Sequence, residues 1–421
     1  MRVTFLTHYY PPEVGAPQAR ISTLARLLAE RGMQVTIHAP PPHYPHGRVP
    51  APYRGLAFRT ERQGSVAVLR SPVLAAPNRG FARRLVDHAS FAASALATGA
   101  VAGPADVVVA ESPPLFLAAA AGPYARLARA ALVLNVADRW PASAVELGAL
   151  RSRSAIRAAE ALERACYRRA DAITVPTEGL AAELGALPEA RGKVLRLGPA
   201  VDTERFRPSP PRAGTGPLRI LYAGTIGLAQ GVETLVEAVR IVGPDAELWV
   251  AGDGAEAPAL HQRLAREPAA NVRLLGSVPH AEVPRLYEAA DVGAVLLRDR
   301  PIFQRALPTK LLEGMAAGRP LLLSASGESA RLVEAAGAGL VVPPEDAGAL
   351  AGAIRRLNSM LASLPELGAA GRAHVQRRYD WRPVVEAWQE LLEAVAAHAP
   401  NSPRASFLSP MSRGLRRQAR P

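Results

Sequence analysis

The sequence is poor in cysteine, lysine and aromatic residues, and these shortages exclude several classes of protein. Cys166 is the single cysteine among 421 residues, so the chain can form no internal disulfide and no cysteine-based metal cluster. Only two of the 50 basic residues are lysines, and aromatic residues make up 5% of the chain. No Asp-x-Asp motif is present, so we expect no aspartate-held metal and no cofactor.

Long apolar runs are also missing, which argues against a membrane-spanning helix because such a helix needs about 18 or more strongly apolar residues. The nearest candidate, residues 91–102, is mostly alanine. With Phe81, Arg83 and Arg84 just before it, this region could form a basic amphipathic helix at a membrane surface. Burial in a core or in a subunit contact is an equal alternative. Because the chain enters a strand-like run directly after Met1, we expect a cytoplasmic protein, with peripheral attachment to the inner membrane face as an option.

The formal net charge of +13 suits nucleic acid, an anionic membrane or an acidic ligand. The sequence contains no basic repeat interleaved with aromatic residues and no zinc-ligand spacing, which argues against nucleic acid recognition. We therefore assign the charge to phosphate-bearing ligands or to anionic lipid.

Strand-like and helix-like segments alternate through the first half of the chain, which predicts α/β architecture with a doubly wound parallel sheet over residues 1–207. The expected strands are residues 3–6, 34–39, 66–69, 106–110, 131–136, 172–175 and 194–197. Proline and glycine crowd residues 208–217, which we expect to be a linker.

The same alternation restarts after this linker and predicts a second Rossmann-like domain over residues 218–380. Its expected strands are residues 218–222, 247–251, 272–275, 292–296, 320–324 and 340–342. An amphipathic final helix over residues 381–398, separated from the last strand by one other helix, could pack across both domains. The tail, residues 399–421, is basic and is expected to be disordered.

Ligands of parallel sheets bind beyond the carboxyl ends of the strands, so the loops after the strands hold the candidate residues. In the first domain these are Tyr10, Gly15 and Arg20 after the first strand, and Asp138 and Trp140 after the strand at 131–136. Asp138 is the candidate for contacting an acceptor or assisting proton transfer, and Trp140 offers a flat face to a sugar. A loop ion pair and a core tryptophan are the structural alternatives, and Arg20 could be simply solvated.

Glycine-bearing turns follow the first two strands of the second domain. Gly224, Thr225 and Gln230 belong to one turn, and Gly252 and Gly254 belong to the next. Small residues expose backbone N–H groups to an anion, although glycines also form ordinary turns.

Lys310 and Glu313 lie near the start of an expected helix, whose N-terminus favours anions. The ammonium could bind a phosphate, and the carboxylate could accept hydrogen bonds from vicinal hydroxyls such as those of a ribose. A nucleotide-sugar would satisfy both groups. A surface ion pair between residues i and i+3 is the alternative.

Together these segments resemble the family-four glycosyltransferases of GT-B fold, over nearly all residues up to about 396. The subgroup that makes bacterial surface polysaccharides, such as colanic acid and O-antigen, is the most similar. The matching segments are Tyr10-Pro11-Pro12-Glu13 with Gly15 and Arg20, Ser112-Pro113-Pro114-Leu115-Phe116, Asp138 with Trp140-Pro141, Tyr222-Ala223-Gly224 through Gln230-Gly231, and Pro308-Thr309-Lys310 through Glu313.

The resemblance implies two Rossmann-like domains facing a central cleft, with a C-terminal crossover helix. It implies retaining, metal-independent transfer of a sugar from a nucleotide-sugar donor, UDP-linked in our interpretation, to a lipid-linked or saccharide acceptor. The first domain would bind the acceptor through Tyr10, Arg20, Asp138 and Trp140. The donor would be bound by the second domain, with Gly15 also facing it, and Asp138, Lys310 and Glu313 would be catalytic. Closure of the domains would exclude water.

Three features, involving five residues, depart from the family pattern. Arg305 stands where the first glutamate of a Glu-x7-Glu pair is common, Thr225 and Gln230 replace the usual basic residues of the phosphate loop, and Pro199-Ala200 replaces Asn-Gly. With these replacements, the residues expected to bind the donor are Gly15, Gly224, Thr225, Gln230, Gly252, Gly254, Arg305, Lys310 and Glu313.

Other functions stay open at this point. A sugar-nucleotide epimerase or a phosphorylase could use the same fold, and a non-catalytic sugar-binding protein could close around a ligand. A dinucleotide oxidoreductase is disfavoured because no Gly-x-Gly-x-x-Gly turn follows the first strand.

Overall fold

The computed structural model describes residues 1–13, 15–44, 47–55, 57–76, 81–146, 148–210 and 216–397. The chain divides into two compact units, one comprising residues 1–198 with the segment from Val385 onward and the other comprising Pro199–Val384. The division falls before the proline-rich segment 208–217 that we expected as the linker. Residues 199–210 belong to the second unit because Val201 bridges to Asp380 and Phe206 is buried in that unit's core. Residues 211–215 of the expected linker and residues 398–421 lie outside the described residues.

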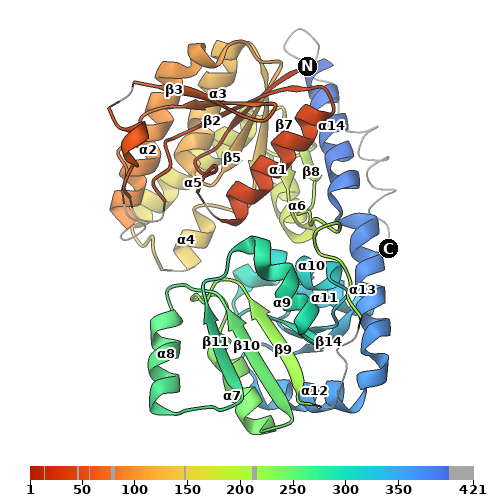
Figure 1. Ribbon diagram of the computed structural model, residues 1–421. Helices are drawn as coiled ribbons and strands as arrows, with labels where there is room; N and C mark the ends of the chain where they lie inside the picture. Colours follow the sequence, from red (N-terminus) through yellow and green to blue (C-terminus); the bar gives the residue numbers. More distant parts are fainter. Residues whose placement is uncertain are drawn as a thin grey trace. The chain divides into compact units, whose positions relative to one another are not determined.

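The first unit is an eight-stranded sheet in the order β3-β4-β2-β1-β5-β6-β7-β8 (Figure 1). Its strands are β1 (Arg2–Leu6), β2 (Gln34–Ala39), β3 (Arg59–Gln63), β4 (Val66–Arg70), β5 (Val107–Ser112), β6 (Ala131–Val136), β7 (Ala172–Val175) and β8 (Val194–Arg196). In register, Val3 of β1 pairs with Val35 of β2 and with Val107 of β5. Strand order reverses between β1 and β5, and this switch point is where doubly wound sheets bind ligands.

The edge strand β3 was not predicted and corrects the expectation of a wholly parallel sheet. It runs antiparallel to β4 and carries the sequence Arg-Thr-Glu-Arg-Gln, most of which is exposed. A solvated edge strand needs no alternation of apolar residues, so its sequence holds no strand pattern.

Helices cover both faces of this sheet. They are α1 (Ala16–Glu30), α2 (Phe81–Thr98), α3 (Leu115–Ala128), α4 (Ala142–Glu146), α5 (Arg153–Arg169) and α6 (Glu178–Ala186), with the 3-10 turns η1 (Ala51–Tyr53) and η2 (Gly99–Ala102). Helix α1 packs against β2 and β4, whereas α3 packs against β5 and β6. Phe91 and Cys166 are buried in the core between this second face and its helices. The Cys166 thiol is therefore buried.

The stretch Arg83–Ala102 is long and apolar enough to cross a membrane, judged by length and composition alone. This corrects the expectation that no segment reaches that length, because the helix begins ten residues before residue 91. A core helix of a soluble protein passes the same test. Phe91 and Ala95 of α2 are fully buried in the first unit, but only 28% of the stretch is buried.

The second unit has a six-stranded parallel sheet in the order β11-β10-β9-β12-β13-β14 (Figure 1). Its strands are β9 (Leu218–Ala223), β10 (Ala246–Ala251), β11 (Val272–Gly276), β12 (Val292–Leu296), β13 (Leu321–Ser324) and β14 (Gly339–Val342). Counted within the unit this is the order 3-2-1-4-5-6 of a Rossmann fold, with its switch point between β9 and β12. The predicted strands of this unit all agree with the structure to within a residue at each end.

Helices again lie on both faces of the sheet, over two separate apolar cores. They are α7 (Val232–Val242), α8 (Ala257–Arg266), α9 (Val283–Ala289), α10 (Thr309–Ala316), α11 (Glu328–Ala336), α12 (Ala347–Ser359) and α13 (Leu364–Arg378), with η3 (His280–Glu282), η4 (Pro301–Arg305) and η5 (Leu361–Ser363). The last helix, α14 (Trp381–Ala397), begins in the second unit and continues into the first. Two helices, α12 and α13, separate it from the last strand, where one was expected.

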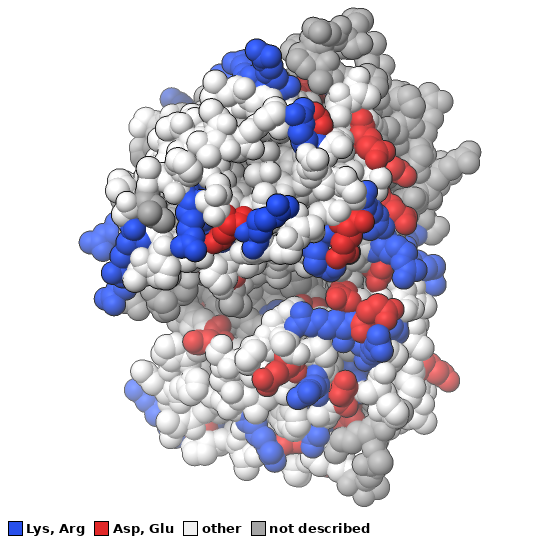
Figure 2. All heavy atoms as spheres, turned by 45° about the horizontal axis from the view of Figure 1, so that its top comes forward, with Lys and Arg blue, Asp and Glu red and all other residues white. Residues whose placement is uncertain are grey.

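Basic and acidic side chains lie next to one another over much of the face drawn in Figure 2. Many of the described arginines are paired with carboxylates; Arg298, for example, contacts Glu233, Glu256 and Glu345. These ion pairs balance charge locally and leave the net excess of +13 unchanged.

Candidate active site

Lys310 is a buried cation at the start of α10, in the second unit. Its side chain is 9% exposed, and its ammonium donates a hydrogen bond of 2.7 Å to Tyr222 Oη and lies 4.1 Å from the centre of the Tyr222 ring. The Tyr222 hydroxyl in turn donates to the backbone oxygen of Thr225. Burial lowers the pKa of Lys310 to about 8, and Glu313 opposes this shift.

The ammonium lacks a full set of partners among the described residues. An ammonium has three N–H donors, and among the residues that the structure describes Tyr222 is its single hydrogen-bond acceptor. The predicted alternative, a surface ion pair of Lys310 with Glu313, is wrong because Lys310 is buried and bonds to Tyr222 instead. A desolvated cation with unused N–H donors is suited to binding an anionic ligand.

The glycine turns after β9 and β10 pack against one another and against Lys310. A Cβ at Gly224 would lie 2.9 Å from Lys310 Nζ, and a Cβ at Gly252 would lie 1.9 Å from the carbonyl oxygen of Gly224. A Cβ at Gly254 would lie 2.3 Å from the carbonyl oxygen of Ile226. Only glycine fits at Gly252 and Gly254, and the structure brings both turns to the carboxyl ends of adjacent strands, beside the switch point.

Thr225 and Gln230 lie in the turn after β9. The Gln230 side chain accepts a hydrogen bond of 3.2 Å from the Gly227 amide, so it closes the turn from within. Arg298, which sequence reasoning did not single out, holds the same turn from outside. It donates from its backbone amide to Ala229 and from Nε to Leu228.

Glu313 lies one turn beyond Lys310 on α10, and its carboxylate is largely buried. Oε1 is 2.9 Å from Nε2 of His280, a half-exposed residue of η3 that sequence reasoning also missed. Arg305 lies at the end of η4, shortly before α10, and is partly exposed. The structure thus brings Lys310, Gly224, Thr225, Gly252 and Gly254 together, with Glu313 and Arg305 on the neighbouring segments.

In the first unit, Arg20 and Glu111 form an ion pair at the switch point between β1 and β5. Arg20 Nη2 lies 3.0 and 3.1 Å from the two oxygens of Glu111, and Asn135 Nδ2 donates to the same carboxylate. Arg20 stands in the second turn of α1, and its counter-charge is the Glu111 carboxylate. The pairing orients a guanidinium that is 26% exposed.

Tyr10 and Gly15 follow β1. Tyr10 is buried, its ring lies 5.6 Å from the Arg70 guanidinium, and burial raises its pKa to about 12. Gly15 precedes α1, and a Cβ there would lie 2.5 Å from Oε1 of Gln18, a buried atom without a hydrogen-bond partner among the described residues.

Asp138 and Trp140 follow β6. Asp138 is half-buried and accepts a hydrogen bond of 2.8 Å from the Arg139 amide. Arg139 reaches away to Glu163 and Glu183. Trp140 is partly buried and packs against the core of the first unit.

Comparison with known proteins assigns this arrangement to a class. Residues 15–200 match the family described as "Glycosyl transferase 4-like domain", and residues 217–359 match "Glycosyl transferases group 1". Sucrose-phosphate synthase from Thermosynechococcus elongatus has a similar fold, with a TM-score of 0.76 at 20% identity, over 94% of this chain and 99% of that one. Anabaena HepE in complex with UDP-glucose gives a TM-score of 0.68 at 16% identity, over 93% and 99%. The chain is a glycosyltransferase with the two-domain GT-B fold.

More specifically, the chain belongs to the family-four glycosyltransferases. It is similar to the putative colanic acid biosynthesis glycosyl transferase WcaI of Escherichia coli K12, with 24% identity over 88% of this chain and 94% of that protein. It is also 30% identical to the probable glycosyltransferase WbjE of Pseudomonas aeruginosa, over 38% of this chain. That match spans 40% of WbjE, and several other curated relatives are matched over about half of their length. The predicted fold class, family and enzyme class are confirmed.

Proposed function

We propose that this enzyme transfers a sugar, with retention of anomeric configuration and without a catalytic metal, from a nucleotide-sugar to a lipid-linked or saccharide acceptor. The second unit binds the donor, and the first unit binds the acceptor. The product contributes to a bacterial exopolysaccharide or O-antigen, in keeping with the names of relatives such as WcaI.

The buried ammonium of Lys310 carries this proposal. Its unused N–H donors and the N-terminus of α10, beside the turn that contains Thr225, together form a cradle for a diphosphate. As the bond from the sugar to the diphosphate breaks, negative charge develops on the leaving oxygen, and a desolvated cation stabilises that charge more strongly than an exposed one would. Arg305 adds a second positive charge nearby, at the position where relatives of the family commonly have a glutamate.

Glu313 is assigned to the ribose hydroxyls of the donor, because an ionised carboxylate accepts two hydrogen bonds from vicinal hydroxyls. The His280 ring, 2.9 Å from Glu313, fixes the orientation of that carboxylate. We assign UDP as the nucleotide, and the UDP and UDP-glucose complexes of the structurally similar HepE support the choice.

Acceptor binding is assigned to Tyr10, Arg20, Asp138 and Trp140 of the first unit. Glu111, the partner of Arg20, lies at the carboxyl end of β5, and Asp138 follows β6, so both carboxylates lie at the ligand-binding edge of that sheet. Asp138 supplies an oxygen that can accept the proton of an acceptor hydroxyl.

The test is a transfer assay on the purified protein with UDP-glucose, UDP-galactose or UDP-N-acetylglucosamine and a polyprenyl-diphosphate-linked saccharide. We expect UDP release that depends on the acceptor, and a product whose new glycosidic bond keeps the anomeric configuration of the donor by NMR. Conversion of the sugar-nucleotide without an acceptor product would make the protein an epimerase, and formation of a sugar phosphate from inorganic phosphate would make it a phosphorylase. Binding without turnover would contradict the proposal.

Peripheral membrane attachment is proposed through α2. Arg83 and Arg84 are exposed there, and Val86 on the same helix is 54% exposed. An acceptor anchored in a bilayer would be delivered to this unit by such contact. Co-sedimentation with vesicles that contain anionic lipid should be strong at low salt and lost at high salt, and double replacement of Arg83 and Arg84 by Gln should weaken it. Absence of binding at low salt would contradict the attachment.

A further inference from the structure

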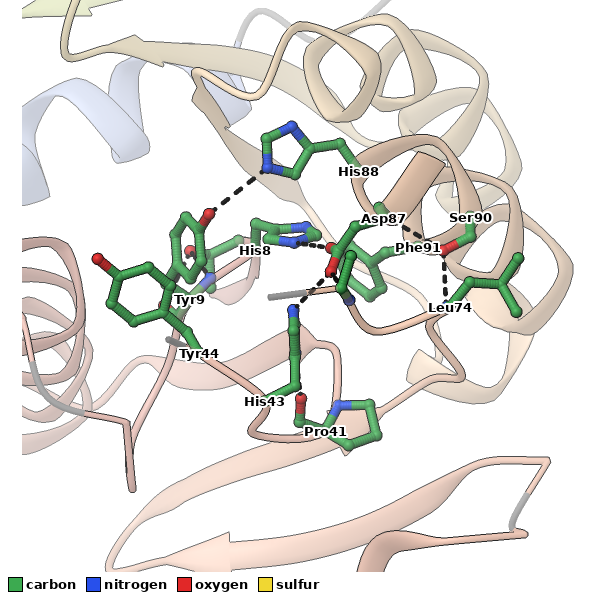
Figure 3. Close-up of polar contacts among 12 residues, drawn as sticks. His8, Tyr9, Pro41, His43, Tyr44, Leu74, Asp87, His88, Ser90 and Phe91 are labelled. Atoms are coloured by element: carbon green, nitrogen blue, oxygen red, sulfur yellow. Dashed lines mark hydrogen bonds and ion pairs between the residues drawn. The ribbon is translucent and has the colours of Figure 1, made fainter. Parts of the chain in front are cut away.

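Three buried side chains of the first unit, His8, His43 and Asp87, converge on one point (Figure 3). We call them the His8–His43–Asp87 cluster. Nε2 of His8 lies 2.7 Å from Oδ1 of Asp87, and Nε2 of His43 lies 3.1 Å from Oδ2. The three ligand atoms all lie within 4.8 Å of one another, and each residue is at most 5% exposed. Neither the sequence motifs nor the proposed transfer reaction accounts for this convergence.

The cluster joins three segments that are far apart in the sequence. His8 follows β1, His43 follows β2, and Asp87 lies on α2. The first of these segments also carries Tyr10 and Gly15, which are assigned to ligand binding. Any group that ties the three side chains together therefore fixes the loops at the ligand-binding edge of the sheet.

The surrounding contacts orient the ring of His43 and the carboxylate for ligation. His43 Nδ1 lies 2.8 Å from the backbone oxygen of Pro41, so it carries a proton and leaves Nε2 directed at the cluster. A backbone carbonyl on the distal ring nitrogen is the usual support of a metal-bound histidine. Asp87 Oδ2 accepts from the Ala76 amide at 2.9 Å, and Glu13 accepts from the amides of His43 and Tyr44.

Without a cation, the cluster has to hold a buried ionic charge. An ionised carboxylate only accepts hydrogen bonds, so the Nε2 atoms of both histidines have to donate to Asp87. Because His43 Nδ1 also donates to Pro41, the His43 ring then carries two protons and a positive charge.

We propose that the His8–His43–Asp87 cluster binds a divalent transition metal ion of the zinc class. Two imidazole nitrogens and one carboxylate oxygen form a donor set that zinc prefers, with bonds of about 2.0–2.2 Å. To admit the ion, the His8–Asp87 contact of 2.7 Å has to lengthen as the three side chains turn from hydrogen bonding to ligation. The ion replaces the Nε2 protons of both rings: the His43 proton is released, and the His8 proton moves to Nδ1, so that both bound rings are neutral. His8 Nδ1 has no hydrogen-bond partner among the described residues.

The role of this ion is structural. The cluster is buried within the first unit, whereas Lys310 and the turns beside it, which are assigned to the diphosphate of the donor, belong to the second. The ion links the loop after β1 to the loop after β2 and to helix α2. The inference is independent of the proposed transfer reaction and would survive its failure.

The first experiment is elemental analysis of the full chain, purified without a polyhistidine tag from cells grown with added zinc. We expect close to one zinc per chain. The variants His8→Gln, His43→Gln and Asp87→Asn should each lower the content at least fivefold. His38→Gln is the matched control, because His38 is an equally buried histidine of the same unit whose ring contacts Tyr124 and Ser71 instead. The control should keep its zinc.

A second measurement does not depend on variants that fold. Addition of Co²⁺ to metal-depleted wild-type protein should give visible absorption bands of a low-symmetry nitrogen and oxygen site, and equimolar Zn²⁺ should remove them and raise the melting temperature. If wild-type protein holds less than 0.1 zinc per chain, on the order of trace contamination, and shows neither Co²⁺ bands nor a thermal shift, the proposal is wrong. The cluster is then a charged hydrogen-bonded triad. Zinc retained by all three variants would also contradict the assignment.

Discussion

Replacing Lys310 by Met should stabilise the unliganded protein while removing its affinity for nucleotide. The two side chains have similar length, and the methionine thioether suits the apolar surroundings that Lys310 occupies between Tyr222 and Gly224. Burial of the wild-type ammonium destabilises the folded protein, and only an anionic ligand offsets this destabilisation. A side chain kept for binding, not for stability, should behave in this way.

The magnitude follows from the pKa. Burial lowers the pKa of Lys310 from the ordinary 10.5 to about 8, so the charged form destabilises the folded state by about 3 kcal/mol at pH 7. Loss of the hydrogen bond to Tyr222 and of the cation–π contact removes about 1–2 kcal/mol of stabilisation. The net gain is about 1–2 kcal/mol, or about 2–8 °C in melting temperature for a unit of this size.

The gain depends on pH with a definite sign. Between pH 8 and 10.5 the unfolded state binds the proton and the folded state does not, so the wild-type protein becomes more stable as the pH rises and the advantage of Lys310→Met shrinks. Calorimetry at pH 7 and pH 9.5, with and without UDP, measures both effects. Lys193→Met is the contrasting control, because Lys193 donates to the carbonyl oxygens of Tyr167, Arg168 and Ala170, and its loss should destabilise. A lower melting temperature for Lys310→Met at pH 7 would refute the reasoning.

Three further predictions concern packing, an ion pair and the thiol. Gly252→Ala places a Cβ 1.9 Å from the Gly224 carbonyl oxygen. It should lower the unfolding free energy, measured by urea titration, by about 2 kcal/mol or more. The control Gly185→Ala meets no atom within 4 Å and should be neutral or stabilising. Glu111→Gln removes the partner of Arg20 and should cost about 2–3 kcal/mol by the same titration; a cost below about 0.5 kcal/mol would show that the pair is not needed. Burial raises the pKa of the Cys166 thiol to about 11. At pH 8 a thiol reagent should therefore react at least about tenfold faster with urea-unfolded protein than with folded protein. Equal rates would contradict the burial of this thiol.

Much of the fold could be predicted because buried parallel strands are short apolar runs in the sequence. Strands such as Gln34–Ala39 and Ala131–Val136 were predicted to the residue. The edge strand Arg59–Gln63 could not be predicted, because a solvated strand has no such pattern. The division between the units also differs from the proline-rich segment, since Phe206 packs into the second unit by contacts that its local sequence does not indicate.

The candidate site could be predicted only as a list of positions. The place of Lys310 at a helix N-terminus is local information and was predicted. Its burial against Tyr222 depends on strand β9, 88 residues earlier, and no local pattern contains that contact. His280 and the His8–His43–Asp87 cluster were missed for the same reason, because each depends on residues brought together by the sheet order.

The central claim is that the second unit binds a nucleoside diphosphate through Lys310 and Glu313. It is tested most directly by titrating the purified protein with UDP, GDP, ADP and dTDP in a calorimeter, with and without EDTA, beside Lys310→Met and Glu313→Gln. The account predicts that one nucleotide, UDP, binds the wild type regardless of EDTA and that either variant loses at least about tenfold in affinity, or about 1.4 kcal/mol. Wild-type affinity in both variants, or no binding of any nucleotide at millimolar concentration, would contradict it.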